Sequence, residues 1–334
     1  MTPDPVALAT TISDDVLFPG ALEVDASDIV TVDRLDRLAS AGFYGLAGPA
    51  DAGGMGLPDM AMALEIIEII ASGCLTTAFV WIQHHGAVRA LAVASQPLRD
   101  AWIRRLCAGD LRAGVAFSGL RRPGPSILTA SPDGDGWRFQ GFAPWVTGWG
   151  RIDVVRAAAR RENGDIVWAL VDAKPGPTLH AERLRLAAVN ASATVTLWFD
   201  QHAVPADRVI SIQPFEEWQQ QDRASLRLNG SLALGVARRC AVLLESDALS
   251  AELDQCRRSL DQALPEAMPE QRAWAAELAL RAATTLVVQG GGRAISLDHQ
   301  AQRLAREALF LLVFGQTAAI KAAQLHRLYD ESHG

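Results

Sequence analysis

The residues "LRDAWIRRLCAGD" (98–110) and "RAGVAFSGL" (112–120) follow one another in the chain, but the spacing of their apolar residues differs. In the first stretch apolar residues recur at helical spacing, and Gly109 stands where a helix would end. The second stretch has the short alternating run of a β-strand. This junction predicts that a helical region gives way to a β region near residue 113.

Helical patterns lie on both sides of the β region. Before it, "LPDMAMALEIIEIIASG" (57–73) and "LTTAFVWIQHHGAVRALAVAS" (75–95) repeat apolar residues at helical spacing. After it, four patterns are long enough for a four-helix bundle, and these cover residues 223–246, 251–264, 270–289 and 304–314. The third of them is apolar nearly all round, so we expect that helix in the middle of the bundle.

Between these helical regions, residues 113 to 212 form short alternating runs separated by turn clusters such as "PDGDG", "ENGD" and "KPGP". They predict a mostly antiparallel β domain, either a small barrel or a sandwich. The expected fold class is therefore α+β. We expect an N-terminal helical domain (residues 1–112), a middle antiparallel β domain (113–213) and a C-terminal four-helix bundle (214–334).

Composition excludes several classes of protein. The 334 residues are 49% hydrophobic and carry a formal net charge of −7 without a basic stripe, so nucleic acid is not an expected partner. The longest apolar runs are too short for a membrane span, and the N-terminus lacks the pattern of a signal peptide. We expect a cytoplasmic protein without a metal site, whose cysteines are reduced core thiols. These are Cys74, Cys107, Cys240 and Cys256.

Four further stretches carry a resemblance to a known family. They are "AGFYGLAGPADAGGMGL" (41–57), "APWVTGWGRIDVV" (143–155), "LWFDQHAVPADRVI" (197–210) and "VVQGGGRAISLDHQAQRLAREALFLLVFGQT" (287–317). In this order they resemble a Gly-rich loop, a flavin-contacting W-I-T-N segment, the exit from the β domain, and a C-terminal region with G-G-x-G, R-D-A and Y-E-G-T of the acyl-CoA dehydrogenase family. The resemblance begins near residue 40 and covers nearly the whole chain.

The resemblance implies both a fold and a chemistry. Members of the family have a helical domain, a β domain and a helical bundle, and they hold FAD. They remove the α-proton of an acyl-CoA with a carboxylate base while the β-hydride leaves for the flavin. The thioester oxygen needs hydrogen-bond donors as enolate character develops. An acyl-CoA substrate is therefore expected, with an electron-transfer flavoprotein as partner if the chain is catalytic.

The resemblance assigns contacts with FAD to four residues of the β domain. Phe117 and Ser118 stand where backbone and hydroxyl groups meet the edge of the isoalloxazine, in place of the commoner V-T. Trp145 and Thr147 match the family's flavin-contacting Trp and Thr. A flat aromatic ring and a hydroxyl group can stack on a flavin and hydrogen bond to it. The alternative is that Trp145 is a core aromatic residue and Thr147 an ordinary strand residue.

Three residues of the bundle are also matched to the cofactor. Gly291 and Gly292 match the Gly-Gly pair that lets the cofactor phosphates of a partner subunit approach the backbone. Thr317 keeps the family's Thr after the turn. The glycines can equally be the C-cap of a helix, and the two roles are compatible.

The chain also departs from the family pattern. "SGLRRPGPS" (118–126) replaces an acidic loop and carries Arg121 and Arg122, which are either solvated or in contact with a phosphate. Trp149 stands where most members are small and polar, and residues 246–271 contain no R-x-x-F-G stretch. These departures predict that the chain holds FAD less well than its relatives, or shares one site with a different subunit.

Both positions that carry the family's catalytic base are empty of carboxylates. Counting from the R-D-A match places Gly315 at the Glu of Y-E-G-T, and aligning the bundle's first helix places Ser225 at the alternative position. Asp222 is the nearest replacement base, although an acid that favours a helix N-terminus is the more ordinary role for it. His84 and His85 are expected to be core or interface residues. The backbone N–H at position 315 can still donate to a thioester oxygen.

Three hypotheses of function remain. The chain is either a working acyl-CoA dehydrogenase-like flavoenzyme with a relocated base, or a non-catalytic subunit of a heteromeric dehydrogenase, or a flavin monooxygenase on the same fold. Apolar helical stretches at 274–289 and 304–314 exceed what one small bundle can hide. We therefore expect a homo-oligomer, or a heteromer with a second subunit of the family.

Overall fold

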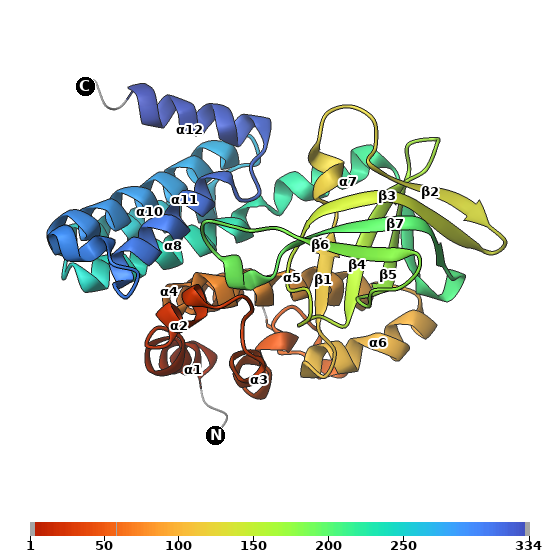
Figure 1. Cartoon of the computed structure of the whole chain (residues 1–334), viewed down its shortest axis with the longest axis horizontal. Coiled ribbons are helices and arrows are strands. Elements are labelled where there is room, and N and C mark those ends of the chain that lie inside the picture. Colours follow the sequence, from red (N-terminus) through yellow and green to blue (C-terminus); the bar gives the residue numbers. More distant parts are fainter. Residues whose placement is uncertain (1–3, 58, 331–334) are drawn as a thin grey trace.

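The computed structural model describes residues 4–57 and 59–330. It contains a helical N-terminal part, a sheet and a C-terminal helical bundle, in the order expected for the α+β fold class. Figure 1 shows the bundle on the left, the sheet on the right, and the N-terminal helices beneath them. The N-terminal helices are α1 (Pro5–Ile12), α2 (Ala21–Ala26), α3 (Val32–Ser40), α4 (Met60–Gly73), α5 (Leu75–Ala92) and α6 (Gln96–Ala108).

Helical structure begins earlier than the sequence patterns indicated. Helices α1 and α2 lie within the expected N-terminal helical domain but precede the helical patterns quoted above, and the turn of π-helix at Ser13–Leu17 continues α1. Helix α1 packs on α4, and its continuation is held there because the Ser13 hydroxyl donates to the Ile69 carbonyl at 2.8 Å. The short length of these first helices hid their periodicity.

The sheet has eight strands. Seven of them follow the path β6-β7-β3-β2-β4-β5-β8, and β1 pairs with β4 off this path. Most neighbours are antiparallel, but β1 and β2 both run parallel to β4. The path ends at β6 and β8, so among the described residues the sheet does not close as a barrel. Its strands are β1 (Ala113–Ala116), β2 (Leu128–Asp133), β3 (Gly136–Val146), β4 (Val154–Arg160), β5 (Ile166–Asp172), β6 (Leu179–Arg183), β7 (Val195–Val204) and β8 (Val209–Gln213).

The two halves of the sheet enclose a core of their own. Phe139 of β3 and Phe199 of β7 meet edge to face, with ring centroids 6.0 Å apart. They share one apolar cluster with Val155 of β4 and Val167 of β5. The sheet is therefore folded over its core like a sandwich, which was one of the two expected forms.

The C-terminal bundle is built around one long helix. Helix α10 contacts α8, α9, α11 and α12, so the stretch expected in the middle of the bundle does lie there. Its inward face is rich in alanine, and these small side chains allow neighbouring helices to approach it. The helices are α7 (Phe215–Ala224), α8 (Leu226–Leu243), α9 (Asp247–Gln262), α10 (Met268–Gly290), α11 (Gln300–Val313) and α12 (Ala318–Asp330).

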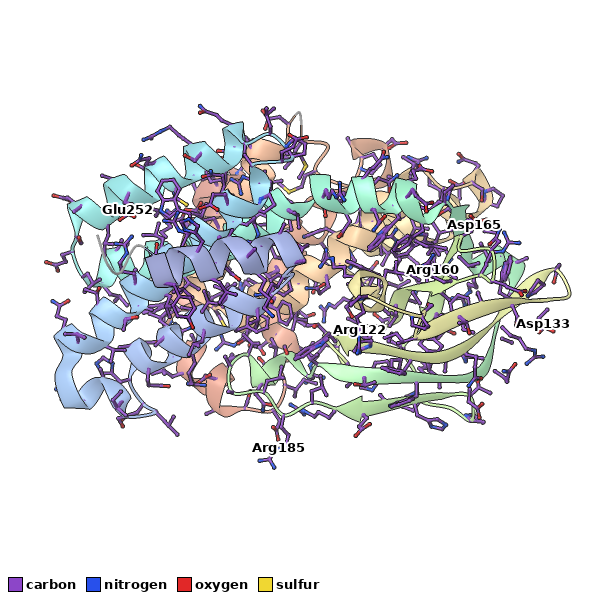
Figure 2. All side chains as sticks on the ribbon, turned by 90° about the horizontal axis from the view of Figure 1, so that it is seen from above. Arg122, Asp133, Arg160, Asp165, Arg185 and Glu252 are labelled. Carbon is purple, nitrogen blue, oxygen red and sulfur yellow. The ribbon has the colours of Figure 1, made fainter. Side chains whose placement is uncertain are left out.

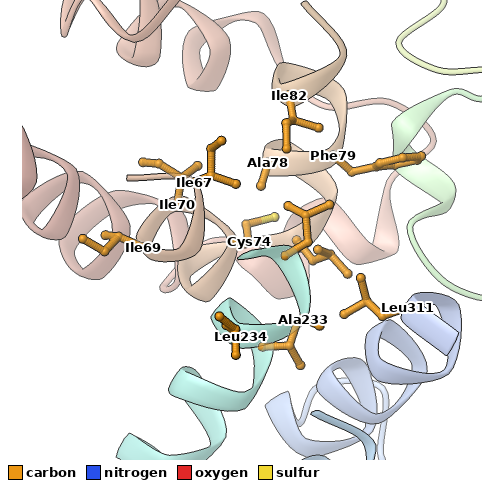
Figure 3. Close-up of a cluster of buried hydrophobic side chains, with 14 of the residues drawn as sticks. Ile67, Ile69, Ile70, Cys74, Ala78, Phe79, Ile82, Ala233, Leu234 and Leu311 are labelled. Atoms are coloured by element: carbon orange, nitrogen blue, oxygen red, sulfur yellow. The ribbon is translucent and has the colours of Figure 1, made fainter. Parts of the chain in front are cut away.

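One apolar core joins the N-terminal helices to the bundle, because α4 packs closely against α8. A Cβ atom at Gly235 would lie 2.5 Å from the Glu68 carbonyl oxygen, so glycine is required for this approach. Figure 3 shows Ile67 and Cys74 on one side of the contact, and Ala233 and Leu311 on the other. The contact fixes the N-terminal helices relative to the bundle.

Helix α5 links this core to the sheet. Its residues Ala87, Val88 and Leu91 pack with Val154 and Leu170 of the sheet in a separate apolar cluster. No helix among the described residues is long and apolar enough to cross a membrane. All four cysteines are free and buried.

Candidate active site

A cavity of about 1300 Å³ lies where the three parts of the chain meet. Its walls come from α5, from β1, β3, β4, β5 and β8, and from the bundle near the turn between α11 and α12. Figure 2 shows Arg122, at the edge of this cavity, between Glu252 on the bundle and Asp133 at the far end of the sheet. We refer to this cavity as the main pocket.

One wall of the main pocket is formed by the ends of β1 and β3. It brings together the four β-domain residues matched to FAD, which are Phe117, Ser118, Trp145 and Thr147. The Ser118 hydroxyl donates to the Pro144 carbonyl and so ties the turn after β1 to β3. The buried Thr147 hydroxyl lies 3.1 Å from that of Thr194. The four residues that the resemblance matched to FAD, from two separate segments, therefore lie on one wall of the pocket.

Trp145 is the unusual residue of this wall. Its backbone is left-handed, with φ of 61°, which is rare for a bulky residue and indicates a position fixed by its surroundings. Its side chain is 53% exposed although it lines the pocket. Trp145 is thus not the core aromatic residue of the alternative interpretation, because its ring is open to a ligand.

The three bundle residues matched to the cofactor lie elsewhere. Gly291 and Gly292 are exposed at the end of α10, and a Cβ atom at either would meet nothing within 4 Å. The Gly291 N–H bonds the Val288 carbonyl, as a helix cap does. The Thr317 hydroxyl accepts a hydrogen bond of 3.2 Å from the Ile320 N–H at the start of α12. None of the three lines the main pocket, so within one chain they are not part of this site.

Gly315 does line the main pocket. Its φ is +62°, a conformation that glycine adopts at little cost, and a Cβ atom there would lie 2.7 Å from Asn229 Nδ2. No backbone or side-chain acceptor lies within hydrogen-bond reach of the Gly315 N–H among the residues described. The turn is therefore shaped for glycine and leaves one backbone donor at the pocket.

Ser225 and Asp222 also line the main pocket, but both are engaged. The Ser225 hydroxyl donates to the Asp222 carbonyl at 2.7 Å. The Asp222 carboxylate accepts two hydrogen bonds from Arg121, at 2.8 Å from Nε and 2.6 Å from Nη2. A bidentate ion pair of this kind holds the carboxylate in place and stabilises its charge. Asp222 is therefore a poor candidate for a general base.

Arg121 corrects an expectation from the sequence. It is not a solvated loop residue, since its guanidinium pairs with Asp222 and lies 5.3 Å from the centre of the Phe117 ring. A phosphate contact stays a prediction. Arg122 is exposed at the rim, as a solvated residue would be. The partner of Arg121 lies 101 residues away, so no local pattern could have revealed it.

The two neighbouring histidines are both buried, as expected. His84 accepts from the Ala113 N–H at 3.0 Å and lies 3.1 Å from the Leu106 carbonyl, and burial lowers its pKa to about 3. His85 lines the main pocket, and neither ring nitrogen has a partner within the described part of the chain. Burial, and then the nearby His84 and Arg89, hold the pKa of His85 well below its ordinary value.

Two arginines of the pocket were missed in the sequence. Arg89 is the only charged residue in α5, and Arg156 interrupts the apolar part of β4. Both line the main pocket. A charged residue inside an otherwise apolar element is the signal that could have found them.

Comparison with known proteins shows what the chain is similar to. A family model, "Acyl-CoA dehydrogenase, N-terminal domain", matches residues 6–110. The human mitochondrial short-chain specific acyl-CoA dehydrogenase is 28% identical over 204 residues, which are 58% of this chain and 49% of that protein. The chain thus spans about half the length of the curated relatives that it matches.

Solved structures agree over a greater length. Butyryl-CoA dehydrogenase from Megasphaera elsdenii superimposes with a TM-score of 0.82 at 17% identity, covering 97% of this chain and 96% of that chain. A glutaryl-CoA dehydrogenase from Mycobacterium smegmatis in complex with FADH2 gives 0.81 at 17% identity, covering 98% and 94%. This chain has the acyl-CoA dehydrogenase fold, and its first third matches the N-terminal domain of that family.

The family match begins at residue 6, and the start of the resemblance near residue 40 was therefore placed too late. Helices α1 and α2 belong to the N-terminal domain of the acyl-CoA dehydrogenase fold. The β-domain residues that resemble the family's flavin contacts lie together on the pocket wall, whereas Gly315 and Ser225 offer no carboxylate. The pocket therefore combines the residues matched to the family's flavin contacts with base positions that carry no carboxylate.

Proposed function

We propose that this chain is a flavoprotein of the acyl-CoA dehydrogenase fold that binds FAD and an acyl-CoA in the main pocket, without a resident base of its own. The observation that carries the proposal is the state of the pocket's carboxylates. Among the described lining residues these are Asp222, which is paired with Arg121, and Glu217, which accepts from Gln221 at 3.2 Å. Asp222 is held in an ion pair, and Glu217 is an exposed residue of α7 that does not stand at either base position of the family.

The pocket fits the isoalloxazine ring of FAD. Its volume of about 1300 Å³ exceeds the ~300–1,000 Å³ that is usual for one small ligand, so a flavin ring and an acyl group can lie in it together. Trp145 offers an exposed ring for stacking, and the left-handed backbone at this residue indicates that its position serves a ligand. FAD, when bound, supplies the hydride acceptor of the family's chemistry.

The residues of this chain can prepare the acyl thioester without reacting. The Gly315 N–H lacks an acceptor among described residues and lies at the pocket, so it can donate to the thioester oxygen. Phe79 of α5, Phe310 of α11 and Phe314 just after α11 line the same pocket, and their apolar side chains suit an acyl group. Binding and orientation are thus supported, and proton removal is not.

A non-catalytic subunit of a heteromeric dehydrogenase is the form of this function that we favour. Leu309 and Val313 of α11 are 57% and 62% exposed, and Leu297 before it is 77% exposed. Apolar side chains in this number favour burial against another subunit. A second subunit with a carboxylate at the base position would supply the missing step, and electron-transfer flavoprotein would then accept the electrons.

Purification of the chain alone tests the proposal. We expect a yellow protein whose flavin absorbance does not bleach when acyl-CoAs are added without oxygen. Trp145→Ala should weaken FAD binding, because a stacking ring is lost, whereas Trp198→Ala should not. Trp198 is a matched control, since it is 42% exposed on β7 and does not line the pocket.

Two results would contradict the proposal. A colourless protein that does not take up added FAD would exclude the flavoprotein. Rapid bleaching by an acyl-CoA would show that a base is present, and Asp222→Asn would then identify whether it is Asp222.

A further inference from the structure

One end of the main pocket is positively charged. Arg89 of α5 and Arg156 of β4 line this end together with His85 and Trp168. Arg156 pairs in register with Val115 of β1, and a Cβ atom at Gly86 of α5 would lie 3.3 Å from the Val115 side chain. Helix α5 and the sheet therefore meet here, at the end of β1 that precedes Phe117.

Arg156 has no counter-ion. Within residues 4–57 and 59–330, no hydrogen bond or ion pair reaches its guanidinium, and its Nε is buried without a partner. The guanidinium lies 3.6 Å from the centre of the Trp168 ring, whose Nε1 is also buried and unpartnered. Burial, and then Arg89, lower the pKa of Arg156 to about 9, so it remains positively charged at neutral pH.

Arg89 adds a second positive charge to this end. It keeps much of its surface accessible at the pocket, yet burial lowers its pKa. Among the described residues, no hydrogen bond or neighbouring charge offsets this effect of burial on the pKa of Arg89. One helical turn earlier, His85 is 3% exposed and both of its nitrogens lack partners. Three side chains thus offer unused donors to the same space.

The other charges of the pocket do not compensate these arginines. Arg121 and Arg306 are already paired, with Asp222 and Asp25. The remaining carboxylate, Glu217, is exposed and accepts from Gln221. A chain whose net charge is −7 therefore concentrates unpaired positive charge at one end of its main pocket. Buried charge of this kind costs free energy unless an opposite charge is bound.

We propose that this end of the main pocket is an anion subsite, in which Arg156, Arg89 and His85 hold the carboxylate or phosphate oxygens of a ligand. The Arg156 guanidinium lies over the Trp168 ring, and the edge of a guanidinium can donate two parallel hydrogen bonds to an oxyanion. The inference rests on the proposed function for the role of the pocket. It adds that the ligand carries an anionic group apart from its thioester.

Two small anions distinguish the sources of this group. Glutarate stands for an acyl group that ends in a carboxylate, and inorganic phosphate stands for a phosphate of the cofactor or of CoA. Isothermal titration of the full chain, without added flavin, should detect binding of one of them. Arg156→Gln and Arg89→Gln should each weaken it by about 10- to 100-fold, which is the range for losing a hydrogen bond to a charged group. Arg156→Lys should retain part of the affinity.

Arg160→Gln is the matched control. Arg160 lies on the same strand and also stacks on an aromatic ring, at 3.9 Å from the centre of Phe215, but its Nε donates to the Gly164 carbonyl. It does not line the main pocket and should leave anion binding unchanged. Circular dichroism of each variant shows whether it folds. If Arg156→Gln does not fold, the anion affinity of Arg89→Gln tests the proposal.

Glutarate binding that depends on Arg156 or Arg89 supports the subsite for a carboxylate, and phosphate binding with the same dependence supports it for a phosphate. The proposal is overturned if neither anion binds, or if Arg160→Gln weakens binding as much as the pocket variants do. Absorbance after FAD addition is measured separately. A protein that binds FAD but neither anion contradicts the subsite alone, and one that binds an anion but no FAD contradicts the proposed function alone.

Discussion

Arg303 and Arg156 are both removed from bulk water, but their surroundings are opposite. Arg303 of α11 is 1% exposed and donates to the Glu307 carboxylate at 2.6 Å and to Gln300 at 2.7 Å. Arg156 of β4 faces the main pocket and has no carboxylate partner within the described chain. A charge in the core is thus neutralised by the fold itself. The comparison indicates that a charge in the pocket is left for a ligand to neutralise.

The largest loss of stability is expected when the buried ion pair of Arg303 is removed. Glu307→Gln would leave Arg303 without its counter-ion, and removing one partner of a buried ion pair costs several kcal/mol. We expect a loss of about 3 kcal/mol in the free energy of unfolding, measured by urea denaturation. Burial raises the pKa of Glu307, so its charge depends on Arg303.

Asp254→Asn provides the control for that loss. Asp254 pairs with Arg257 at 2.5 Å, but its side chain is 57% exposed. An exposed pair contributes at most ~1 kcal/mol, and we expect a change below about 0.5 kcal/mol. Equal losses of unfolding free energy in the two variants would mean that burial does not determine how much an ion pair contributes to stability.

His84 extends the comparison from the buried, charged arginines to a buried side chain that stays neutral. Both nitrogens of His84 are engaged, and burial lowers its pKa from 6.5 to about 3. The unfolded chain therefore binds this proton below pH ~6.5 and the folded chain does not, so acid favours unfolding. At pH 5 we expect His84 to cost about 2 kcal/mol relative to pH 8.

Urea denaturation between pH 8 and pH 5 measures this cost. His84→Gln should reduce the loss of stability over that interval, because one titrating group is removed. An unchanged pH dependence in the variant would mean that His84 is already protonated in the folded protein, or is not buried there.

The fold could be predicted from the sequence because it depends on periodicity. The change of apolar spacing between residues 98–110 and 112–120 corresponds to α6 and β1, and the apolar stretch 270–289 lies in α10 at the centre of the bundle. Helices α1 and α2 were missed, because eight and six residues are too few for a clear pattern.

The site was less predictable, because it depends on contacts between distant residues. The sequence shows that position 315 lacks a carboxylate. It does not show that Asn229 leaves little room for a side chain at this position. Asp222 could be suggested as a base, but its pairing with Arg121 could not. Arg89 and Arg156 are 67 positions apart in the sequence. Only the packing of α5 on the sheet brings them to one pocket.

A smaller effect is expected when a carboxylate is introduced into the pocket. Gly315→Glu places a side chain at φ of +62°, where Asn229 Nδ2 is 2.7 Å from the new Cβ position. A left-handed conformation costs about 1–2 kcal/mol for a residue other than glycine. Arg121 Nη1 lies 3.8 Å from that position, so the new carboxylate can pair with it and would not act as a free base.

Gly315→Ala is the matched control for the backbone, since it meets the same φ and the same Asn229 without a charge. We expect both variants to lose stability by about 1–2 kcal/mol in urea denaturation, and neither to gain acyl-CoA-dependent bleaching of the flavin. Bleaching by the Glu variant alone would show that the base position is still functional and that only the carboxylate was missing.

The smallest change in the free energy of unfolding is expected for a substitution of Arg156. Whether that substitution stabilises or destabilises the protein shows whether the guanidinium serves the fold. Arg156→Met replaces an unpaired, desolvated charge with an apolar side chain of similar length, which removes the cost of burying that charge. The stacking on Trp168 is lost at the same time, and such contacts contribute about 0.5–2 kcal/mol. We expect a net gain of about 1 kcal/mol in the free energy of unfolding in the absence of ligand, since desolvation is the larger of the two terms.

Arg160→Met is the control and should lose stability instead, because the Arg160 guanidinium is stacked on Phe215 and hydrogen bonded to Gly164. If Arg156→Met is less stable than the wild type, the guanidinium serves the fold through Trp168, and Arg156 then resembles Arg303 more than it differs from it.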